Sequence, residues 1–154
     1  MIKRKNILKV AIDSPAAAGA GTQAKLIAKH YSLLALDTGK CYRFIANIKL
    51  TEPKKFNYLY VKKKIKKLKI QDLQNKKLLS DKVATIASVI AKDKKIRKLV
   101  HSFQLKCAYN PPKKYKGSVL DGRDIGSVIV PDADVKLFIS ASLKVRAIRR
   151  YKEL

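Results

Sequence analysis

The sequence predicts an α/β domain with a mostly parallel sheet and helices on its faces. Short apolar runs without strict alternation recur along the chain, which is typical of strands buried on both faces. Segments with helical spacing separate these runs, so strands and helices alternate. Three of the runs end in an aspartate, at Asp13, Asp37 and Asp121, and a glycine follows within a few residues each time.

The first third of the chain carries the clearest pattern. Basic residues precede an apolar run at 7–12, but this run breaks at Asp13 without a plausible cleavage site, so we predict a strand rather than a signal peptide. Residues 22–31 have the spacing of a helix. Residues 33–37, LLALD, predict a second strand, and residues 38–50 a second helix.

The middle of the chain is harder to interpret. Residues 51–80 contain Pro53 and many lysines, and we expect a partly helical insertion there. Helical spacing returns in two pieces, residues 80–91 and 93–109. Two prolines and a glycine mark residues 110–117 as a loop.

The last part repeats the opening pattern. A strand is predicted to end at Asp121, and residues 133–141, ADVKLFISA, predict a further strand of the buried type. Ser142 is a suitable N-cap for a basic helix that runs to the last residue. We find no internal repeat.

Composition limits the class of protein. A chain of 154 residues with 47% hydrophobic residues suits one folded domain, and no apolar run is long enough to span a membrane. Cys41 and Cys107 lie far apart without metal-ligand spacing, which favours a reducing, cytoplasmic compartment and no protein-bound structural metal. His30 and His101 each fall in a helical pattern and are interpreted as structural or exposed.

The formal net charge of +25 has two explanations. Clustered basic residues bind polyanions, and the run at 61–77, VKKKIKKLKIQDLQNKK, is the best candidate for such a patch. Scattered lysines on solvated helix faces produce the same total. The few arginines are more informative, because a planar guanidinium grips phosphate oxygens in a bidentate manner.

One stretch resembles a phosphate-binding loop. A strand leads through SPAAAGAGT, residues 14–22, into a helix, and free N–H groups at a helix N-terminus attract anions. The match to G-x-x-x-x-G-K-[ST] is partial, since Ser14 replaces the first glycine and Ala20 the lysine. A plain strand-to-helix turn would explain this stretch alone.

Two further motifs follow predicted strands. In LDTGKCYR, residues 36–43, Thr38 can cap a helix and Arg43 lies about one turn further on. In LDGRDIG, residues 120–126, Arg123 and Asp124 stand side by side after a strand. Ligands of open α/β sheets bind at the carboxyl ends of strands, so three such motifs in order predict a nucleotide site.

At these residues the chain resembles the bacterial cytidylate kinases, which are nucleoside monophosphate kinases. The resemblance rests on AIDSPAAAGAGTQAKLIAKH, LDTGKCYRFIA, VATIASVIAKDKKIRKLV, VLDGRDIGSVIVPDADVKLFISAS and VRAIRRYKEL. It covers most of the chain except about residues 51–78. It implies a P-loop NTPase-type parallel sheet with flanking helices, one domain over residues 1–154, and a monophosphate-binding insertion at about 51–110.

The resemblance also implies an activity and its site. Members transfer the terminal phosphoryl group of ATP to CMP or dCMP with Mg²⁺, by positioning and charge neutralisation. The ATP phosphates would lie in the loop formed by Ser14, Pro15, Ala16, Ala17, Ala18, Gly19, Ala20, Gly21 and Thr22. The CMP contacts would come from Thr38, Arg43, Ser88, Arg97, Arg123 and Asp124, with Arg43 and Arg97 on the phosphate and Ser88, Arg123 and Asp124 on the base.

Two departures from the family bear on catalysis. Ala20 stands where the family has the loop lysine, a loss that would cost about 3–4 kcal/mol by analogy with other electrostatic donors. We expect Lys40 to supply the missing charge, with a lysine of no special role as the alternative. Arg149 and Arg150 open the segment that forms a mobile lid in the family, and after Leu154 the family continues, so we expect a C-terminally incomplete kinase.

Three functions therefore remain open: an ATP-dependent kinase of CMP and dCMP, a catalytically weak or silent relative that binds CMP, and a basic protein that binds RNA or another polyanion. The first accounts for the arginines and for DGRDIG, so we expect a cytoplasmic, monomeric enzyme of pyrimidine nucleotide metabolism. We expect small-molecule partners and neither a membrane nor a nucleic acid.

Overall fold

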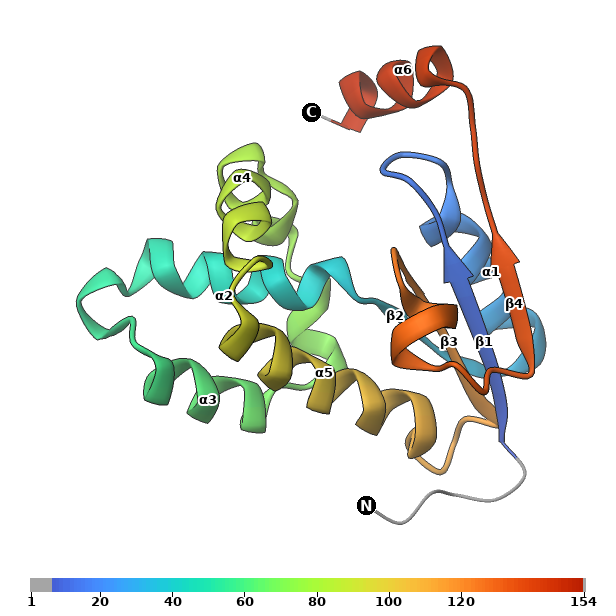
Figure 1. Ribbon diagram of the computed structural model, residues 1–154, viewed down its shortest axis with the longest axis horizontal. Coiled ribbons are helices and arrows are strands. Elements are labelled where there is room, and N and C mark those ends of the chain that lie inside the picture. The colour runs from blue at the N-terminus through green and yellow to red at the C-terminus, as the bar shows by residue number, and fades with distance from the viewer. Residues whose placement is uncertain (1–6, 154) are drawn as a thin grey trace. The chain divides into compact units, whose positions relative to one another are not determined.

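The computed structural model describes residues 7–153, so the predicted strand at 7–12 lies within it and the preceding basic residues lie outside. The chain divides into two compact units. The first comprises residues 1–38 and 104–154, and the second comprises residues 39–103. We describe each unit by itself (Figure 1).

The first unit is built on a parallel sheet of four strands in the order β2-β3-β1-β4. These strands are Leu33–Asp37 (β2), Gly117–Gly122 (β3), Leu8–Asp13 (β1) and Val135–Phe138 (β4). Asp13 pairs with Gly122, and Asp37 pairs with Asp121, so the carboxyl ends of three neighbouring strands lie level. The α/β parallel fold predicted from the sequence is confirmed.

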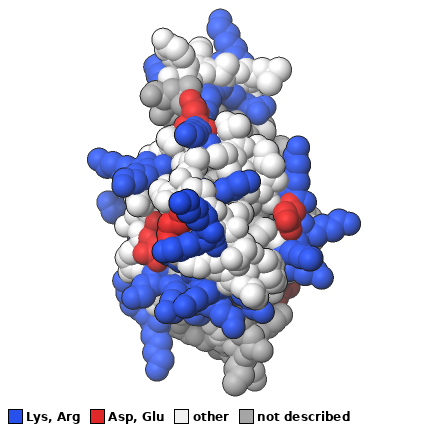
Figure 2. Space-filling model, turned by 90° about the vertical axis from the view of Figure 1, so that its left-hand side faces the viewer, with Lys and Arg blue, Asp and Glu red and all other residues white. Residues whose placement is uncertain are grey.

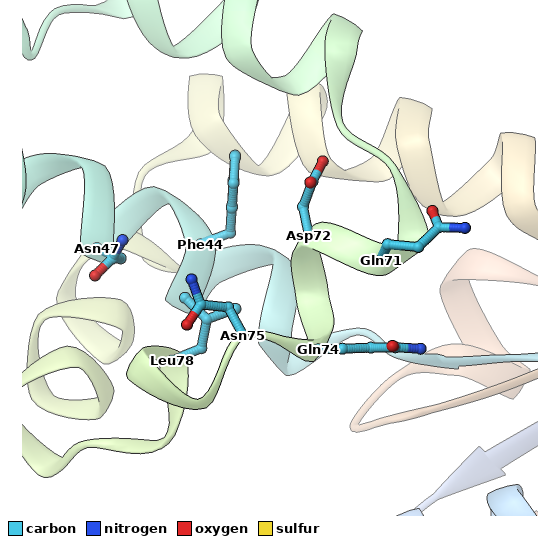
Figure 3. A pocket seen from close by; sticks show the side chains of 7 residues that line it. All are labelled: Phe44, Asn47, Gln71, Asp72, Gln74, Asn75 and Leu78. Carbon is cyan, nitrogen blue, oxygen red and sulfur yellow. The ribbon is translucent and has the colours of Figure 1, made fainter.

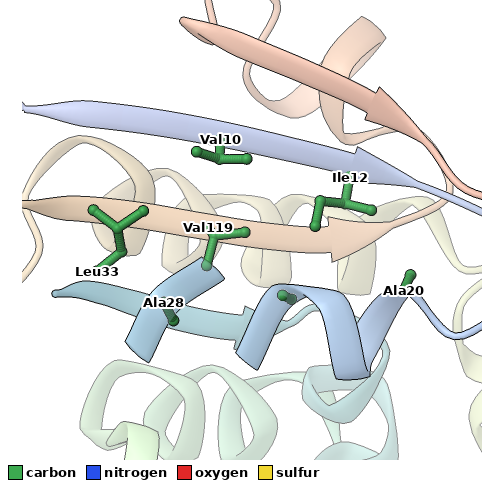
Figure 4. Close-up of a cluster of buried hydrophobic side chains, with 7 residues drawn as sticks. Val10, Ile12, Ala20, Ala28, Leu33 and Val119 are labelled. Atoms are coloured by element: carbon green, nitrogen blue, oxygen red, sulfur yellow. The ribbon is translucent and has the colours of Figure 1, made fainter. Parts of the chain in front are cut away.

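Helix α1, Ala20–Tyr31, covers one face of the sheet. Its buried residues, Ala20, Ala24 and Ala28, repeat at four-residue spacing and so form one narrow stripe. This stripe packs on apolar strand residues, and because the side chains are methyl groups the helix lies close to the strands (Figure 4). The strand residues of this cluster are Val10, Ile12, Leu33 and Val119.

The opposite face of β3 is held to helix α5, Lys94–Tyr109, which runs from the second unit into the first. Ser118 points away from the Val119 face, because successive strand residues alternate. Its buried hydroxyl donates a hydrogen bond to the carbonyl of Ala108 over 3.0 Å. The sheet therefore has helices on both faces.

The carboxyl-terminal part of this unit departs from the sequence prediction in one respect. Strand β4 lies at the edge of the sheet, and all four of its residues are exposed, including Phe138 at 75%. The prediction of a buried strand there was wrong, because an edge strand has a neighbour on one side only. After β4, helix α6, Leu143–Glu153, begins at Ser142, whose hydroxyl accepts a hydrogen bond from the N–H of Val145, as predicted.

The second unit is helical. Helix α2, Gly39–Thr51, packs against α4, Asp81–Ile90, through buried residues that include Cys41 and Ile45 on α2 and Val83 and Ala87 on α4. Between them lie α3, Tyr58–Lys67, and short 3₁₀ turns at Pro53–Lys55, Ile70–Gln74 and Lys76–Leu79. The sequence prediction of a partly helical segment over 51–80 is confirmed. None of the described helices is both long and apolar enough to cross a membrane.

Candidate functional site

The loop between β1 and α1 lies at the carboxyl ends of the strands. Its first residue, Ser14, donates its N–H to the carbonyl of Gly122 over 3.0 Å, which fixes the loop to β3. The loop then turns through two residues with positive φ, Ala17 at 57° and Gly19 at 101°. Glycine adopts the conformation of Gly19 without strain, whereas Ala17 carries a Cβ into the left-handed region.

Helix α1 begins directly from this loop. The carbonyl of Gly19 accepts the N–H groups of Thr22 and Gln23, and no side chain caps the helix. Among the described residues, no acceptor takes the N–H groups of Ala17, Gly19, Ala20 and Gly21. Open N–H groups at the positive end of a helix dipole are the usual means of holding an anion.

Three arginines donate hydrogen bonds to backbone carbonyls of the loop. Arg123 donates to the carbonyl of Ser14, Arg146 to that of Ala16 over 2.7 Å, and Arg149 to that of Ala18 over 2.8 Å. The salt bridges among the described residues involve none of these guanidinium groups. Three positively charged groups therefore contact the loop. The sequence singled out Arg123 and Arg149 but missed Arg146, whose signal is its position one helical turn before Arg149.

Carboxylates lie at the same edge of the sheet. Asp13, at the end of β1, accepts the backbone N–H groups of Ile125 and Gly126 at 2.6 and 2.9 Å. These bonds start a π-helix, Ile125–Ile129, directly after Arg123 and Asp124. The sequence analysis used Asp13 only to end a strand and did not foresee that it organises this turn.

Asp121 and Thr38 lie beside the loop as well. A Cβ placed on Gly21 would lie 3.8 Å from Oδ2 of Asp121. The buried hydroxyl of Thr38 donates to the carbonyl of Asp121 over 2.9 Å. A Cβ on Gly122 would lie only 2.5 Å from Oγ1 of Thr38, so a side chain there would displace the threonine.

The remaining predicted site residues belong to the second unit. Arg43, on α2, donates to the carbonyl of Leu78 over 2.9 Å and so ties the 3₁₀ turn Lys76–Leu79 to the helix. Ser88 is exposed near the end of α4, and its hydroxyl donates to the carbonyl of Thr85. Arg97, in the first turn of α5, donates to the carbonyl of Ala91 over 3.4 Å. Lys40, the second residue of α2, is half-buried.

The second unit also contains a pocket of about 430 Å³ beside Arg43 (Figure 3). Its walls are mostly polar, and come from α2 and from the two 3₁₀ turns that follow α3. The lining residues are Phe44, Asn47, Gln71, Asp72, Gln74, Asn75 and Leu78. Among the lining residues, Asp72 and Asn75 each have a side-chain oxygen that already accepts a hydrogen bond from a backbone N–H group.

The structure thus brings part of the predicted set together. Within the first unit, the loop at 14–22 is in contact with Arg123 and Arg149. Thr38 lies at the same strand ends, and Arg150 is half-buried on α6. No cluster of three or more histidine, cysteine or acidic side chains within residues 7–153 could hold a metal ion by itself.

Comparison with known proteins identifies the family. The family model for cytidylate kinase matches residues 10–154, which include both the loop and the Arg123 turn. The chain belongs to the cytidylate kinase family. The prediction of this family from the sequence is confirmed.

Cytidylate kinases of several organisms are among its relatives. That of a Bradyrhizobium species is 41% identical over 150 residues, covering 94% of this chain and 66% of the relative. That of Azorhizobium caulinodans is 43% identical over 145 residues, covering 94% of this chain and 68% of the relative. That of Mesorhizobium japonicum is 37% identical over 150 residues, covering 97% of this chain and 68% of the relative. The chain therefore spans about two thirds of the length of these relatives.

Proposed function

We propose that the chain is an ATP-dependent kinase that phosphorylates CMP and dCMP to the diphosphates. The observation that carries this proposal is the loop at 14–22, with open N–H groups inside and arginines around it, in a member of the cytidylate kinase family. Phosphoryl transfer needs positioning and charge neutralisation rather than a covalent intermediate, and both are what this arrangement supplies.

The ATP phosphates are assigned to the loop. The N–H groups of Ala17, Gly19, Ala20 and Gly21 are free to donate to phosphate oxygens, and the dipole of α1 adds to their attraction. The hydroxyl of Thr22 is exposed at the start of the same helix. Arg149 and Arg150 on α6, and Lys40 on α2, are the cations that we assign to the transferred group.

CMP is assigned to the other predicted residues. Arg43 and Arg97 present guanidinium groups suited to a dianionic phosphate. Ser88, Arg123 and Asp124 carry the donors and acceptors needed for a cytosine edge, and Thr38 completes the set. A base that leaves one of these groups unpaired is rejected, because burying an unsatisfied polar group is costly.

Mg²⁺ is assigned to the nucleotide rather than to a cage of protein ligands. Mg²⁺ keeps several waters and is held by one or two carboxylates together with substrate phosphates. Asp121, whose Oδ2 lies beside Gly21 of the loop, has the donor chemistry for this role, and Thr22 can add a hydroxyl. Bound there, the ion would neutralise charge on the ATP phosphates.

Polyanion binding is not favoured as the main function. Lysines and arginines lie scattered over the face shown in Figure 2, with a few acidic side chains among them. Within the second unit, Glu52 pairs with both Lys55 and Lys64 and so offsets one positive charge there. A cytoplasmic location and a monomeric state are further proposals. The buried thiols of Cys41 and Cys107, which are not joined in a disulfide, support the first, and the family resemblance supports both.

The experiment that tests the function has two steps. Thermal unfolding is followed with CMP, dCMP, UMP, AMP or ATP, because a ligand at about 100 times its dissociation constant adds roughly 2.7 kcal/mol to the stability of the folded state. We expect ATP, CMP and dCMP to raise the midpoint and UMP and AMP to leave it nearly unchanged. Formation of CDP from CMP and ATP is then measured with Mg²⁺. Binding without CDP formation would leave a silent CMP-binding relative, and the absence of any shift would refute both.

A further inference from the structure

The loop at 14–22 lacks a positively charged side chain of its own. In loops of this type a lysine follows the last glycine of the G-x-x-x-x-G-K pattern and reaches the β- and γ-phosphates. Here Ala20 occupies that position and is 5% exposed, so nothing in the loop itself extends toward a phosphate chain. The question is whether another described residue brings a cation to the same place.

The side chain of Arg149 lies beside Gly19, the residue that immediately precedes Ala20. A Cβ built on Gly19 would stand 3.3 Å from Nη1 of Arg149 and 3.9 Å from its Cζ. Nη1 donates to the carbonyl of Ala18 over 2.8 Å and contacts that of Ala17 at 3.5 Å. Because both contacts use Nη1, Nε and Nη2 remain for an anion.

Arg146 fixes the helix that carries Arg149. It stands three residues earlier on α6, on the same face, and its Nε donates to the carbonyl of Ala16 over 2.7 Å. Two successive turns of α6 thus bind two neighbouring parts of the loop through side chains. The apolar residues of α6 contribute little to this contact, since Leu143, Val145, Ile148 and Tyr151 are all exposed.

The charge of Arg149 is not neutralised by a carboxylate. The salt bridges among residues 7–153 involve neither Arg146 nor Arg149, and both guanidinium groups donate hydrogen bonds to backbone carbonyls. Carbonyl oxygens hold a guanidinium in place and leave its full charge, whereas a salt bridge would cancel it. Arginine also remains protonated at every relevant pH.

We propose that Arg149 replaces the missing loop lysine as the cation for the phosphate chain of a nucleoside triphosphate, with Arg146 as its positioning residue. This inference rests on the proposed function, because it assumes that the loop binds ATP. It differs from our sequence-based assignment of the missing charge to Lys40. Lys40 belongs to the second unit, and Arg149 has direct contacts with the loop.

The test measures binding rather than turnover. The whole chain is titrated with inorganic tripolyphosphate and with ATP by isothermal calorimetry, and CMP is titrated separately. Two variants change Arg149: Arg149→Gln keeps hydrogen-bond donors but removes the charge, and Arg149→Lys keeps the charge. Ala20→Lys is tested alone and in combination with Arg149→Gln. Lys152→Gln removes one charge from an exposed position of the same helix and serves as the matched control. Lys40→Gln tests the competing assignment.

We expect Arg149→Gln to weaken tripolyphosphate and ATP binding by about 10- to 100-fold, as for hydrogen bonds to a charged group. Lys152→Gln should change it less than about twofold, in line with an exposed charge. Lys40→Gln should weaken it less than Arg149→Gln does. Arg149→Lys should retain more affinity than Arg149→Gln. The decisive result is that Ala20→Lys restores binding in the Arg149→Gln background and adds much less to the unmodified chain.

Other outcomes separate the two proposals. If the unmodified chain binds neither tripolyphosphate nor ATP, the ATP half of the proposed function fails, and this inference fails with it. If the chain binds ATP but Arg149→Gln, shown by circular dichroism to be folded, binds it equally well, only this inference is overturned. The inference is also overturned if Lys40→Gln loses much of its affinity for tripolyphosphate and ATP while Ala20→Lys fails to restore binding to Arg149→Gln. That result would assign the missing charge to Lys40.

Discussion

The carboxylate of Asp13 accepts the backbone N–H of Gly126 over 2.9 Å, and this contact joins the end of β1 to the turn that carries Arg123. Its other oxygen accepts the N–H of Ile125 over 2.6 Å. The residue that precedes the loop at 14–22 thus also sets the turn that we assign to the cytosine edge. One side chain couples two parts of the proposed site within the first unit.

Replacing this carboxylate should destabilise the fold. Asp13→Ala leaves two N–H groups in a partly buried turn without an acceptor, and we expect a loss of about 3 kcal/mol in the free energy of unfolding. Urea denaturation gives the value. Asp93→Ala is the matched control, because Asp93 accepts the N–H groups of Lys95 and Ile96 at an exposed helix start, where a lost cap costs about 1 kcal/mol. Equal losses at the two sites would contradict the special role of Asp13.

Glycine at position 17 should stabilise the protein. Ala17 has a φ of 57°, and the left-handed conformation costs a residue with a Cβ about 1–2 kcal/mol. We expect Ala17→Gly to add about 1 kcal/mol to the free energy of unfolding, after the greater freedom of glycine in the unfolded chain is subtracted. Ala18→Gly, at the adjacent residue with negative φ, should instead lower stability. A loss in both variants would show that the strain at Ala17 is not relieved by glycine.

The sequence predicted the elements that depend on local patterns. The strands β1, β2 and β3 and helix α1 form where apolar residues cluster at strand or helix spacing, and each was predicted within about two residues. Strand β4 was assigned to the wrong environment, because an apolar run does not show whether a second neighbour covers it.

The contacts that build the site are mostly long-range, and no local pattern contains them. Asp13 bonds Ile125 across 112 positions of the sequence, and Arg149 bonds Ala18 across 131. The sequence predicts a helix cap for Thr38, whereas its hydroxyl donates to the carbonyl of Asp121. Arg123 and Arg149 were singled out by chemistry and by resemblance, while the partners that hold them required the structure.

Alkaline pH should weaken the junction between α5 and the segment before β4. Tyr109, at the end of α5, donates its hydroxyl to Asp132, and burial together with this carboxylate raises the pKa of Tyr109 from 10.0 to about 12. The folded state therefore favours the protonated phenol. Its contribution to stability is complete below pH 10 and is lost as the pH rises toward 12. We expect the difference in unfolding free energy between the unmodified chain and Tyr109→Phe to shrink between pH 10 and pH 12. A difference that stays constant over this range would contradict the stabilising role of the protonated phenol.

Binding of the CMP phosphate should depend on Arg43 more than binding of the base does. Arg43 is half-buried on α2 and held by the carbonyl of Leu78, so its fork is already ordered. We expect Arg43→Ala to weaken CMP binding by about 10- to 100-fold, as for the loss of charge-assisted hydrogen bonds. Cytidine, which has no phosphate, should bind the variant and the unmodified chain alike. Lys49→Ala, which removes an exposed charge from the same helix, is the control and should leave both ligands unaffected. Calorimetric titration of the two ligands measures this difference, and equal losses for CMP and cytidine would place Arg43 away from the phosphate.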